Sequence, residues 1–362
     1  MEVLPCNFRC CQIFGLWYES SSYAVLKKMY RSAVLVIIFQ FIIGEIIELF
    51  LMEGDVGEFT ELLYLACTFG AFGVKLLNFM ARREKILDLL EDFKSQNYQA
   101  KSPQELQLYD KYRRTAKLIF LCAFAACSLT GGALCFLPLI VASENKQLHL
   151  PLRYLQFWDT SNNVCFWISY ALKILSVVCS VPLNVSMDTL IYGFLILSTG
   201  QFQMNSCRFR DGQESMKSCL NHYLMIVATV KKIQNFFVPV MLPLLLSSFI
   251  TLCTSIFEVS RRQVGSFDFL LLSAYLVCML FQIFFYCYFG NELQVQSQAV
   301  PEAVYCSNWI DRTREERKNL WLVMLFAQRG CDISFHGQCK LSLNTFTSVV
   351  KTSYAALNLL KK

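Results

Sequence analysis

Hydrophobic and polar positions divide this chain into long apolar segments separated by charged ones. Seven apolar segments are long enough to cross the roughly 30 Å hydrocarbon core of a bilayer as a helix of about 20 residues. They cover about residues 33–51, 59–79, 116–141, 164–197, 236–257, 269–289 and 341–360. The pattern therefore predicts an all-α, polytopic membrane protein with seven transmembrane helices.

The last apolar segment differs from the others because it carries many hydroxyl and amide side chains. These residues are Ser342, Asn344, Thr345, Thr347, Ser348, Thr352, Ser353 and Asn358. A helix that faces only lipid does not tolerate so many polar groups, whereas a helix that packs closely on other helices or borders water does. The segment is therefore predicted to contact other subunits or to line a pore.

Two segments between apolar runs, residues 204–232 and 293–329, combine charges with apolar residues at helical spacing. We expect the fourth, fifth and sixth helices to project through them beyond the membrane and to form a cytoplasmic bundle, in which Trp309 and Trp321 pack. Solvated loops are the alternative. The predicted organisation is a cytoplasmic segment 1–32, six transmembrane helices within 33–289, a cytoplasmic anchor 290–340 and a last helix 341–362.

The distribution of basic residues predicts the orientation. Of the 33 Lys and Arg residues, 24 precede the first span or lie in the loops after the second, fourth and sixth spans, and six lie on the other side. Because Lys and Arg accumulate in cytoplasmic loops, the N-terminus is predicted to be cytoplasmic and the C-terminus extracellular. This is opposite to the orientation of a G-protein-coupled receptor.

Composition supports the membrane assignment and argues against several functions. Only 17% of residues are charged, against about 25% in soluble domains, and the mean hydropathy is +0.41. The net charge of +6 is spread along the chain, which does not indicate a nucleic-acid-binding surface. The 17 cysteines show no paired CxxC motifs, so we predict no metal site and no cofactor. Hydrolase and phosphate-binding motifs are also absent from the sequence, and we predict no catalytic residues.

Charged residues inside the predicted spans are costly and need partners or water. Glu45 and Glu48 share a face of the first helix, and Lys173 lies in the outer half of the fourth. A Glu45–Lys173 contact is one hypothesis; the alternative is that Glu48 reaches the surface and Lys173 borders a wet cavity. Lys75 is expected to extend to the cytoplasmic headgroups, and Lys351 to face a protein neighbour or water. An amphipathic stretch, residues 14–29, is expected at the membrane surface.

The chain resembles the insect odorant receptors, and among them the ligand-tuning subunits rather than the shared co-receptor subunit. The matching residues are the run YFGNEL at 288–293, Ser297, Ala303, Tyr305, Trp309, SLNTF at 342–346, KTSY at 351–354, and Leu359 with Leu360. Fainter matches are His222 and the pair Leu150–Pro151. The related gustatory receptors place a Gln five apolar residues after a Thr-Tyr pair, and that Gln is absent here.

The resemblance implies an odorant-gated, nonselective cation channel, a heterotetramer with the co-receptor subunit in the plasma membrane of an olfactory sensory neuron. It implies a pore lined by the last helix, with the gate at Leu357. The i, i+4, i+7 spacing places Phe346, Val350, Ser353, Leu357 and Lys361 on one face of that helix; the alternative is that Leu357 faces neighbouring helices. It also implies a subunit anchor that includes Tyr305, Trp309 and Trp321. Leu360 occupies the position where relatives often carry a pore Gln. A gustatory-type channel and, below it, a metabotropic seven-helix receptor are the alternatives, and the absence of internal repeats argues against a transporter.

The resemblance further implies a pocket for a small volatile odorant in the outer halves of the spans. Such pockets are mostly apolar and aromatic with few polar groups. The candidate ligand-binding residues are Phe69, Phe72, Gly132, Phe136, Phe166, Trp167, Tyr170, Lys173, Ser273, Tyr275 and Met279. Each of them is also explained by helix packing alone, and the sequence does not identify the odorant.

Overall fold

The computed structural model describes residues 3–17, 24–52, 56–145, 163–212, 214–335 and 339–360. Eleven helices occur in this part of the chain, with a single turn of 3-10 helix and a two-stranded hairpin. The helices are α1 (Pro5–Ile13), α2 (Ala24–Leu51), α3 (Val56–Ala81), α4 (Arg83–Lys94), α5 (Pro103–Asn145), α6 (Asn163–Asp211), α7 (Met216–Arg261), α8 (Phe267–Gln298), α9 (Val300–Tyr305), α10 (Arg314–Ala327) and α11 (Leu343–Leu360). The 3-10 turn is Gln96–Tyr98, and strands β1 (Ser334–Phe335) and β2 (Cys339–Lys340) pair antiparallel.

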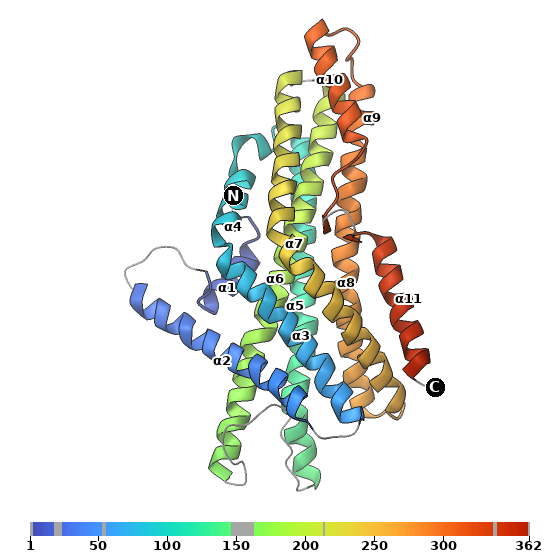
Figure 1. Ribbon diagram of the computed structural model, residues 1–362. Coiled ribbons are helices and arrows are strands. Elements are labelled where there is room, and N and C mark those ends of the chain that lie inside the picture. Colours follow the sequence, from blue (N-terminus) through green and yellow to red (C-terminus); the bar gives the residue numbers. More distant parts are fainter. Residues whose placement is uncertain are drawn as a thin grey trace.

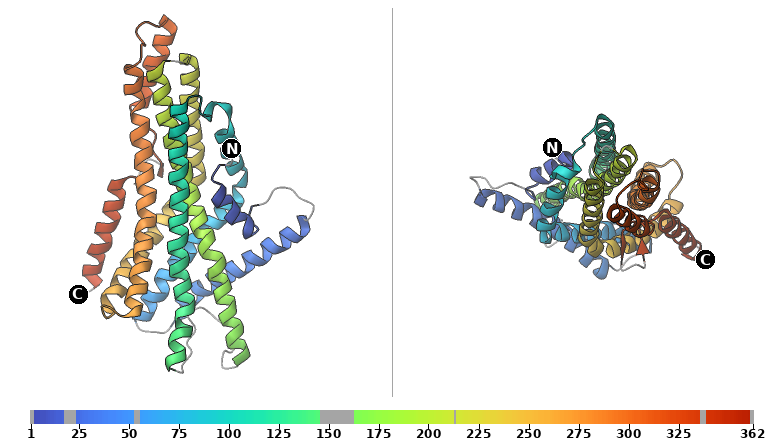
Figure 2. Two further views of the ribbon diagram at one scale, coloured as in Figure 1. Left: turned by 180° about the vertical axis from the view of Figure 1, so that it is seen from behind. Right: turned by 90° about the horizontal axis from the view of Figure 1, so that it is seen from above.

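The helices form one elongated bundle (Figure 1). Helices α5, α6, α7 and α8 run along its length, while α2 and α3 cross them obliquely (Figure 2). Helices α9 and α10 lie at the end of the bundle opposite to α11. Six of these helices, α2, α3 and α5–α8, are long and apolar enough to cross a membrane, and α11 is the predicted seventh.

The three helices predicted to project, α6, α7 and α8, are longer than a bilayer crossing requires, and so is α5 with 43 residues. Helix α6 has 49 residues, which corresponds to roughly 70 Å at 1.5 Å per residue, more than twice the hydrocarbon thickness. Helices α7 and α8 have 46 and 32 residues. The predicted projection of the fourth, fifth and sixth spans as helices is confirmed. Among the described residues, the segment 204–232 is helical except at 212, 214 and 215. The segment 293–329 contains the end of α8, α9 and α10 but is not helical at 306–313.

Local sequence explains where several helices begin and bend. The hydroxyls of Ser215 and Ser266 accept hydrogen bonds from backbone N–H groups in the first turns of α7 and α8. Thr313 and Glu316 form a reciprocal capping box at the start of α10. Helix α7 changes direction near its middle (Figure 1), where Pro239 and Pro243 each remove a backbone donor.

The N-terminal region differs from the prediction of a surface helix over residues 14–29. Leu16 and Trp17 are buried, and residues 18–23 lie outside the described part of the chain. The preceding residues form α1, and Asn7 Nδ2 donates to the carbonyl of Ser186 at 2.9 Å and to Thr189 Oγ1 at 2.7 Å on α6. The prediction fails for Leu16 and Trp17, which pack inside the bundle after α1, whereas Val25, Leu26 and Met29 at the start of α2 are exposed.

A buried polar cluster holds the segment between α4 and α5 against the projecting bundle. Arg208 forms an ion pair with Glu105, Nε to Oε1 at 2.9 Å, and donates to the carbonyl oxygens of Asn97 at 3.0 Å and Gln99 at 2.9 Å. The Nη1 of Arg208 lies 3.1 Å from Nδ1 of His222. Because a guanidinium only donates, Nδ1 must accept, and the ring is a neutral imidazole with its proton on Nε2, which donates to Gln201 Oε1 at 3.0 Å.

Candidate functional site: a cavity between α3, α5, α6 and α8

A cavity of about 320 Å³ lies between α3, α5, α6 and α8. Most of its walls are apolar or aromatic side chains: Leu65, Phe69 and Phe72 of α3; Ala123, Ala126, Gly131 and Leu134 of α5; Val177, Val181, Val185 and Tyr192 of α6; Tyr275, Met279, Phe281 and Phe285 of α8. Its volume is at the lower end of the range of small-molecule sites, and its lining has the usual character of such sites.

One end of the cavity is built on a buried ion pair. Lys75 Nζ lies 2.7 Å from Asp188 Oδ1, and the two residues are only 4% and 5% exposed. Lys75 also donates to Oδ1 of Asn184. The Asp188 carboxylate accepts further hydrogen bonds from Tyr286 Oη at 2.6 Å and Gln282 Nε2 at 2.7 Å. These groups come from α3, α6 and α8, and they stabilise two charges that would otherwise be very unfavourable in the interior.

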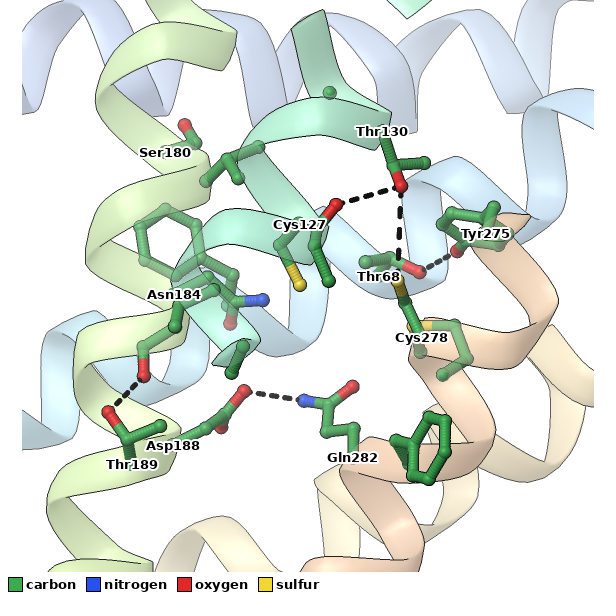
Figure 3. A pocket seen from close by; sticks show the side chains of 18 of the residues that line it. Thr68, Cys127, Thr130, Ser180, Asn184, Asp188, Thr189, Tyr275, Cys278 and Gln282 are labelled. Carbon is green, nitrogen blue, oxygen red and sulfur yellow. Dashed lines mark hydrogen bonds between the residues drawn. The ribbon is translucent and has the colours of Figure 1, made fainter. Parts of the chain in front are cut away.

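Other polar groups occupy the opposite end of the cavity (Figure 3). The hydroxyls of Thr68 and Tyr275 are 2.5 Å apart. Thr130 Oγ1 lies 3.9 Å from the Cys278 thiol, and Cys127 lines the cavity beside them. The cavity thus has polar groups at both ends and apolar walls between them.

Four of the predicted ligand-binding residues line this cavity: Phe69, Phe72, Tyr275 and Met279. The other seven, Gly132, Phe136, Phe166, Trp167, Tyr170, Lys173 and Ser273, are not among its lining residues. Phe136 and Trp167 are about half exposed, and the Tyr170 hydroxyl donates to the carbonyl of Cys135 at 2.7 Å. On α6 the cavity is lined by residues 177–192, which are deeper in the bundle than the segment 164–173 from which the candidates were taken.

The sequence reading missed the polar residues of the ion-paired end. The sequence did contain a signal for them, since Asp188, Asn184 and Gln282 lie inside long apolar runs. A polar group within a span is energetically unfavourable unless it has a partner, and such a residue therefore often marks a functional site. The expectation that Lys75 extends to the cytoplasmic headgroups was wrong. The partner Asp188, which lies on another helix, holds the ammonium inside the bundle.

Glu45 and Lys173 are brought near each other, as the sequence suggested. They lie on α2 and α6, both are at most 1% exposed, and their charges interact. The carboxylate oxygens of Glu45 make no hydrogen bond with any residue that the structure describes. The proximity therefore does not amount to a direct hydrogen-bonded pair.

The last helix, α11, packs on α7 and α8. The Phe346 ring meets Phe284 of α8 edge to face, with centroids 5.5 Å apart. At Gly290 of α8, an added Cβ would lie 2.6 Å from Leu341 Cβ. These contacts join the beginning of α11 to the helix that supplies Phe281, Gln282 and Phe285 to the cavity.

The residues predicted to line the pore have different environments in the single chain. Ser353 is fully buried against α7, where the Cys253 thiol donates to its carbonyl oxygen at 3.8 Å, whereas Val350 is half-buried. The side chain of Leu357 and the whole of Lys361 lie outside the described residues. The exposed face of α11 consists of Asn344, Thr347, Ser348, Lys351, Thr352, Tyr354 and Ala355.

The predicted anchor residues lie at the projecting end of the bundle. Tyr305 and Trp321 are exposed by 69% and 55%. Trp309 is partly buried and packs against the core of its own chain.

Comparison with known proteins agrees with this architecture. The family model for the 7tm odorant receptors matches residues 55–354 of the 362-residue chain. Odorant receptor 46a, isoform B, of Drosophila melanogaster is 25% identical over 97% of this chain and 96% of its own length. Odorant receptor 82a of the same species is 23% identical over 85% of each. The structure of the insect olfactory receptor OR5 from Machilis hrabei in complex with eugenol superposes with a TM-score of 0.89, at 14% identity, over 99% of this chain and 97% of that one.

The fold and the family match define an all-α, multi-pass membrane receptor, and the chain is not an enzyme. It belongs to the 7tm odorant receptor family of insects. The gustatory-receptor alternative therefore gives way to the odorant receptor family.

Proposed function

We propose that this chain is the odorant-binding subunit of a heteromeric, ligand-gated, nonselective cation channel in the plasma membrane of an olfactory sensory neuron. A small volatile organic molecule occupies the cavity between α3, α5, α6 and α8. The co-receptor subunit completes a heterotetramer, the N-terminus is cytoplasmic, and α11 contributes to the pore. The observation that carries this proposal is the largely apolar cavity of about 320 Å³ with polar groups at its ends.

The contacts of α8 support a route from the cavity to α11. Phe285 lines the cavity and packs on Phe284, with ring centroids 5.8 Å apart. Phe284 in turn meets Phe346 of α11. A ligand that changes the position or tilt of α8 therefore acts directly on the helix proposed to line the pore. This is a proposal of coupling through packed side chains, and its physical test is whether both ends respond to the same substitution.

The proposal is tested by voltage clamp of cells that express this chain with and without a co-receptor subunit, under an odorant panel. We expect a fast cation current only when both subunits are present. The substitution Ala126→Phe fills the cavity and should raise the half-maximal concentration of every active odorant by more than about tenfold, which corresponds to the loss of roughly 1.4 kcal/mol of binding free energy.

The matched control is Leu129→Phe, which adds the same ring on α5 at a position that is 77% exposed. It should leave odorant responses unchanged. A current that requires G proteins, or full responses from Ala126→Phe at normal surface expression, would contradict the proposal.

A further inference from the structure

Two side-chain amides at the ion-paired end of the cavity have orientations that their neighbours determine. The Lys75 ammonium can only donate, so the atom of Asn184 that it contacts is the oxygen Oδ1, and the Nδ2 donors are directed away from it. The Asp188 carboxylate can only accept, so the atom of Gln282 that lies 2.7 Å from it is the nitrogen Nε2. The oxygen Oε1 of Gln282 is therefore directed away from Asp188.

Both of the remaining amide atoms are available to a ligand. Asn184 and Gln282 line the cavity, and Figure 3 shows the Asn184 nitrogen and the Gln282 oxygen facing the space between the helices. Neither atom has a hydrogen-bond partner among the described residues. The cavity thus presents one donor and one acceptor whose orientations are fixed by hydrogen bonds to the same ion pair.

We propose that this donor–acceptor pair makes the cavity selective for neutral odorants that carry a hydroxyl group; this inference rests on the proposed function. A hydroxyl accepts from Asn184 Nδ2–H while it donates to Gln282 Oε1, so both amides are satisfied by one oxygen atom. The hydrocarbon part of the ligand lies against the apolar walls, which include Phe69, Phe72 and Met279.

Other ligand classes satisfy this end of the cavity less well. An ether, ester or aldehyde accepts from Asn184 but leaves the Gln282 oxygen without a donor, and an unpaired buried acceptor is costly. An ammonium gains little, because the Asp188 carboxylate already accepts from Lys75, Gln282 and Tyr286. A carboxylate likewise finds the Lys75 charge already paired. Loss of one such neutral hydrogen bond corresponds to about a five- to tenfold change in affinity.

The test compares isomers that differ only in whether their oxygen can donate a hydrogen bond. 1-Octanol is compared with methyl heptyl ether, and the same alcohol–ether pairs are used from six to ten carbons. Octanal is added as a further molecule that can only accept. They are applied to the heteromer under voltage clamp. We expect half-maximal concentrations about tenfold lower for the alcohols than for their isomeric ethers. Gln282→Met retains the side-chain length but removes the carbonyl acceptor, and it should reduce this ratio to about one while the ether responses persist.

Asn184→Leu provides a second variant in which the donor is removed. It should weaken alcohols, ethers and aldehydes alike. The control is Gln296→Met. Gln296 lies on the same helix as Gln282 but outside the cavity, where it donates to Glu292, so this substitution should leave the alcohol-to-ether ratio unchanged. Surface labelling of each variant separates ligand recognition from folding.

Three outcomes overturn the inference: equal responses of the wild type to alcohols and ethers, an alcohol-to-ether ratio that survives Gln282→Met, or no response to any alcohol. The Ala126→Phe variant distinguishes this failure from that of the proposed function. If Ala126→Phe abolishes responses that show no preference for hydroxyls, the cavity binds odorant but does not select this class.

Discussion

Lys75 Nζ and Asp188 Oδ1 lie 2.7 Å apart inside the helical bundle, and three further side chains from α6 and α8 complete their hydrogen bonds. The pair joins α3 to α6 at the wall of the ligand cavity. Its two residues are separated by more than a hundred positions along the chain, so it is a product of the tertiary structure. It also sets the direction of the two amides that face the cavity.

Removal of only one charge of this pair should be strongly destabilising. Lys75→Met leaves the Asp188 carboxylate buried without its counter-ion, and we expect a loss of about 3–5 kcal/mol in the free energy of unfolding. The double variant Lys75→Met/Asp188→Leu should recover much of that loss because neither charge remains. Thermal unfolding of the purified receptor measures both effects.

The control for this experiment is a more exposed ion pair. Lys340 Nζ lies 2.6 Å from Asp332, and the two side chains are 50% and 32% exposed. Asp332→Asn should change the unfolding free energy by less than about 1 kcal/mol. Equal effects of Lys75→Met and Asp332→Asn would show that the buried pair has no special role in stability.

No other cationic side chain should replace Arg208 without a loss of stability. Its planar guanidinium contacts Glu105, His222 and two backbone carbonyls at once, and a lysine ammonium lacks that geometry. We expect Arg208→Lys to cost more than about 2 kcal/mol in unfolding free energy, since hydrogen bonds to charged groups each contribute about 1.5–3 kcal/mol. Arg210→Lys, an exposed position two residues away, is the matched control and should have no measurable effect on the unfolding temperature.

Gly290 of α8 permits the close approach of the chain that leads into α11. A Cβ at this position would lie 2.6 Å from Leu341 Cβ and 2.7 Å from its carbonyl oxygen, whereas at Gly70 of α3 it would meet nothing within 4 Å. Gly290→Ala should therefore displace the start of α11 and reduce the odorant-gated current at least severalfold. Gly70→Ala should leave the current intact and stabilise α3 by up to about 1 kcal/mol. Currents from Gly290→Ala that match the wild type would show that this approach is not needed for gating.

The edge-to-face contact between Phe284 and Phe346 should contribute to gating. A double-mutant cycle with Phe284→Leu and Phe346→Leu should give a coupling free energy of about 0.5–1.5 kcal/mol. The quantity compared is the maximal odorant-gated current of each variant, expressed relative to its current at a saturating concentration of a reference odorant. Additive effects of the two substitutions would indicate that the rings do not communicate. The half-maximal odorant concentration should change less than the maximal current, because neither ring lines the cavity.

Stability at acidic pH should depend on Glu214, which lies between α6 and α7 outside the membrane-spanning part. Burial alone raises the pKa of this carboxyl, but hydrogen bonds from Lys101 and Ser218 and the charge of Arg208 outweigh it and lower the pKa. A carboxyl with a lowered pKa in the folded state stabilises the fold above its ordinary pKa, and this contribution is lost as the pH falls through the folded-state pKa.

The measurement is thermal unfolding of the wild type and Glu214→Gln between pH 7 and pH 3. The wild type should be the more stable at pH 7, and the difference should shrink as the pH falls. A difference that is constant over this range would contradict the assignment of the lowered pKa.

The sequence by itself determined the helical class, the positions of six long apolar helices and the continuation of the fourth, fifth and sixth spans as long helices. These features depend on local pattern, because a chain inside lipid must satisfy its backbone hydrogen bonds within each helix, and a run of apolar residues therefore reports a span directly. The charges in the loops added the predicted orientation. The series of matching residues between Tyr288 and Tyr354 added the resemblance to the receptor family, which the comparisons support.

The cavity and the charge pairing were decided only by the tertiary structure. Which side chains face a cavity depends on the depth, rotation and tilt of each helix. Phe166 and Trp167 lie about five to six turns of α6 away from Asn184 and Asp188, so the cavity is at another depth of the same helix. Phe136 and Trp167 are half exposed while Phe72 is fully buried, although all three belong to apolar spans. The partner of Lys75 lies 113 residues further along the chain, and hydropathy, which is computed over neighbours in sequence, contains no information about that distance in space.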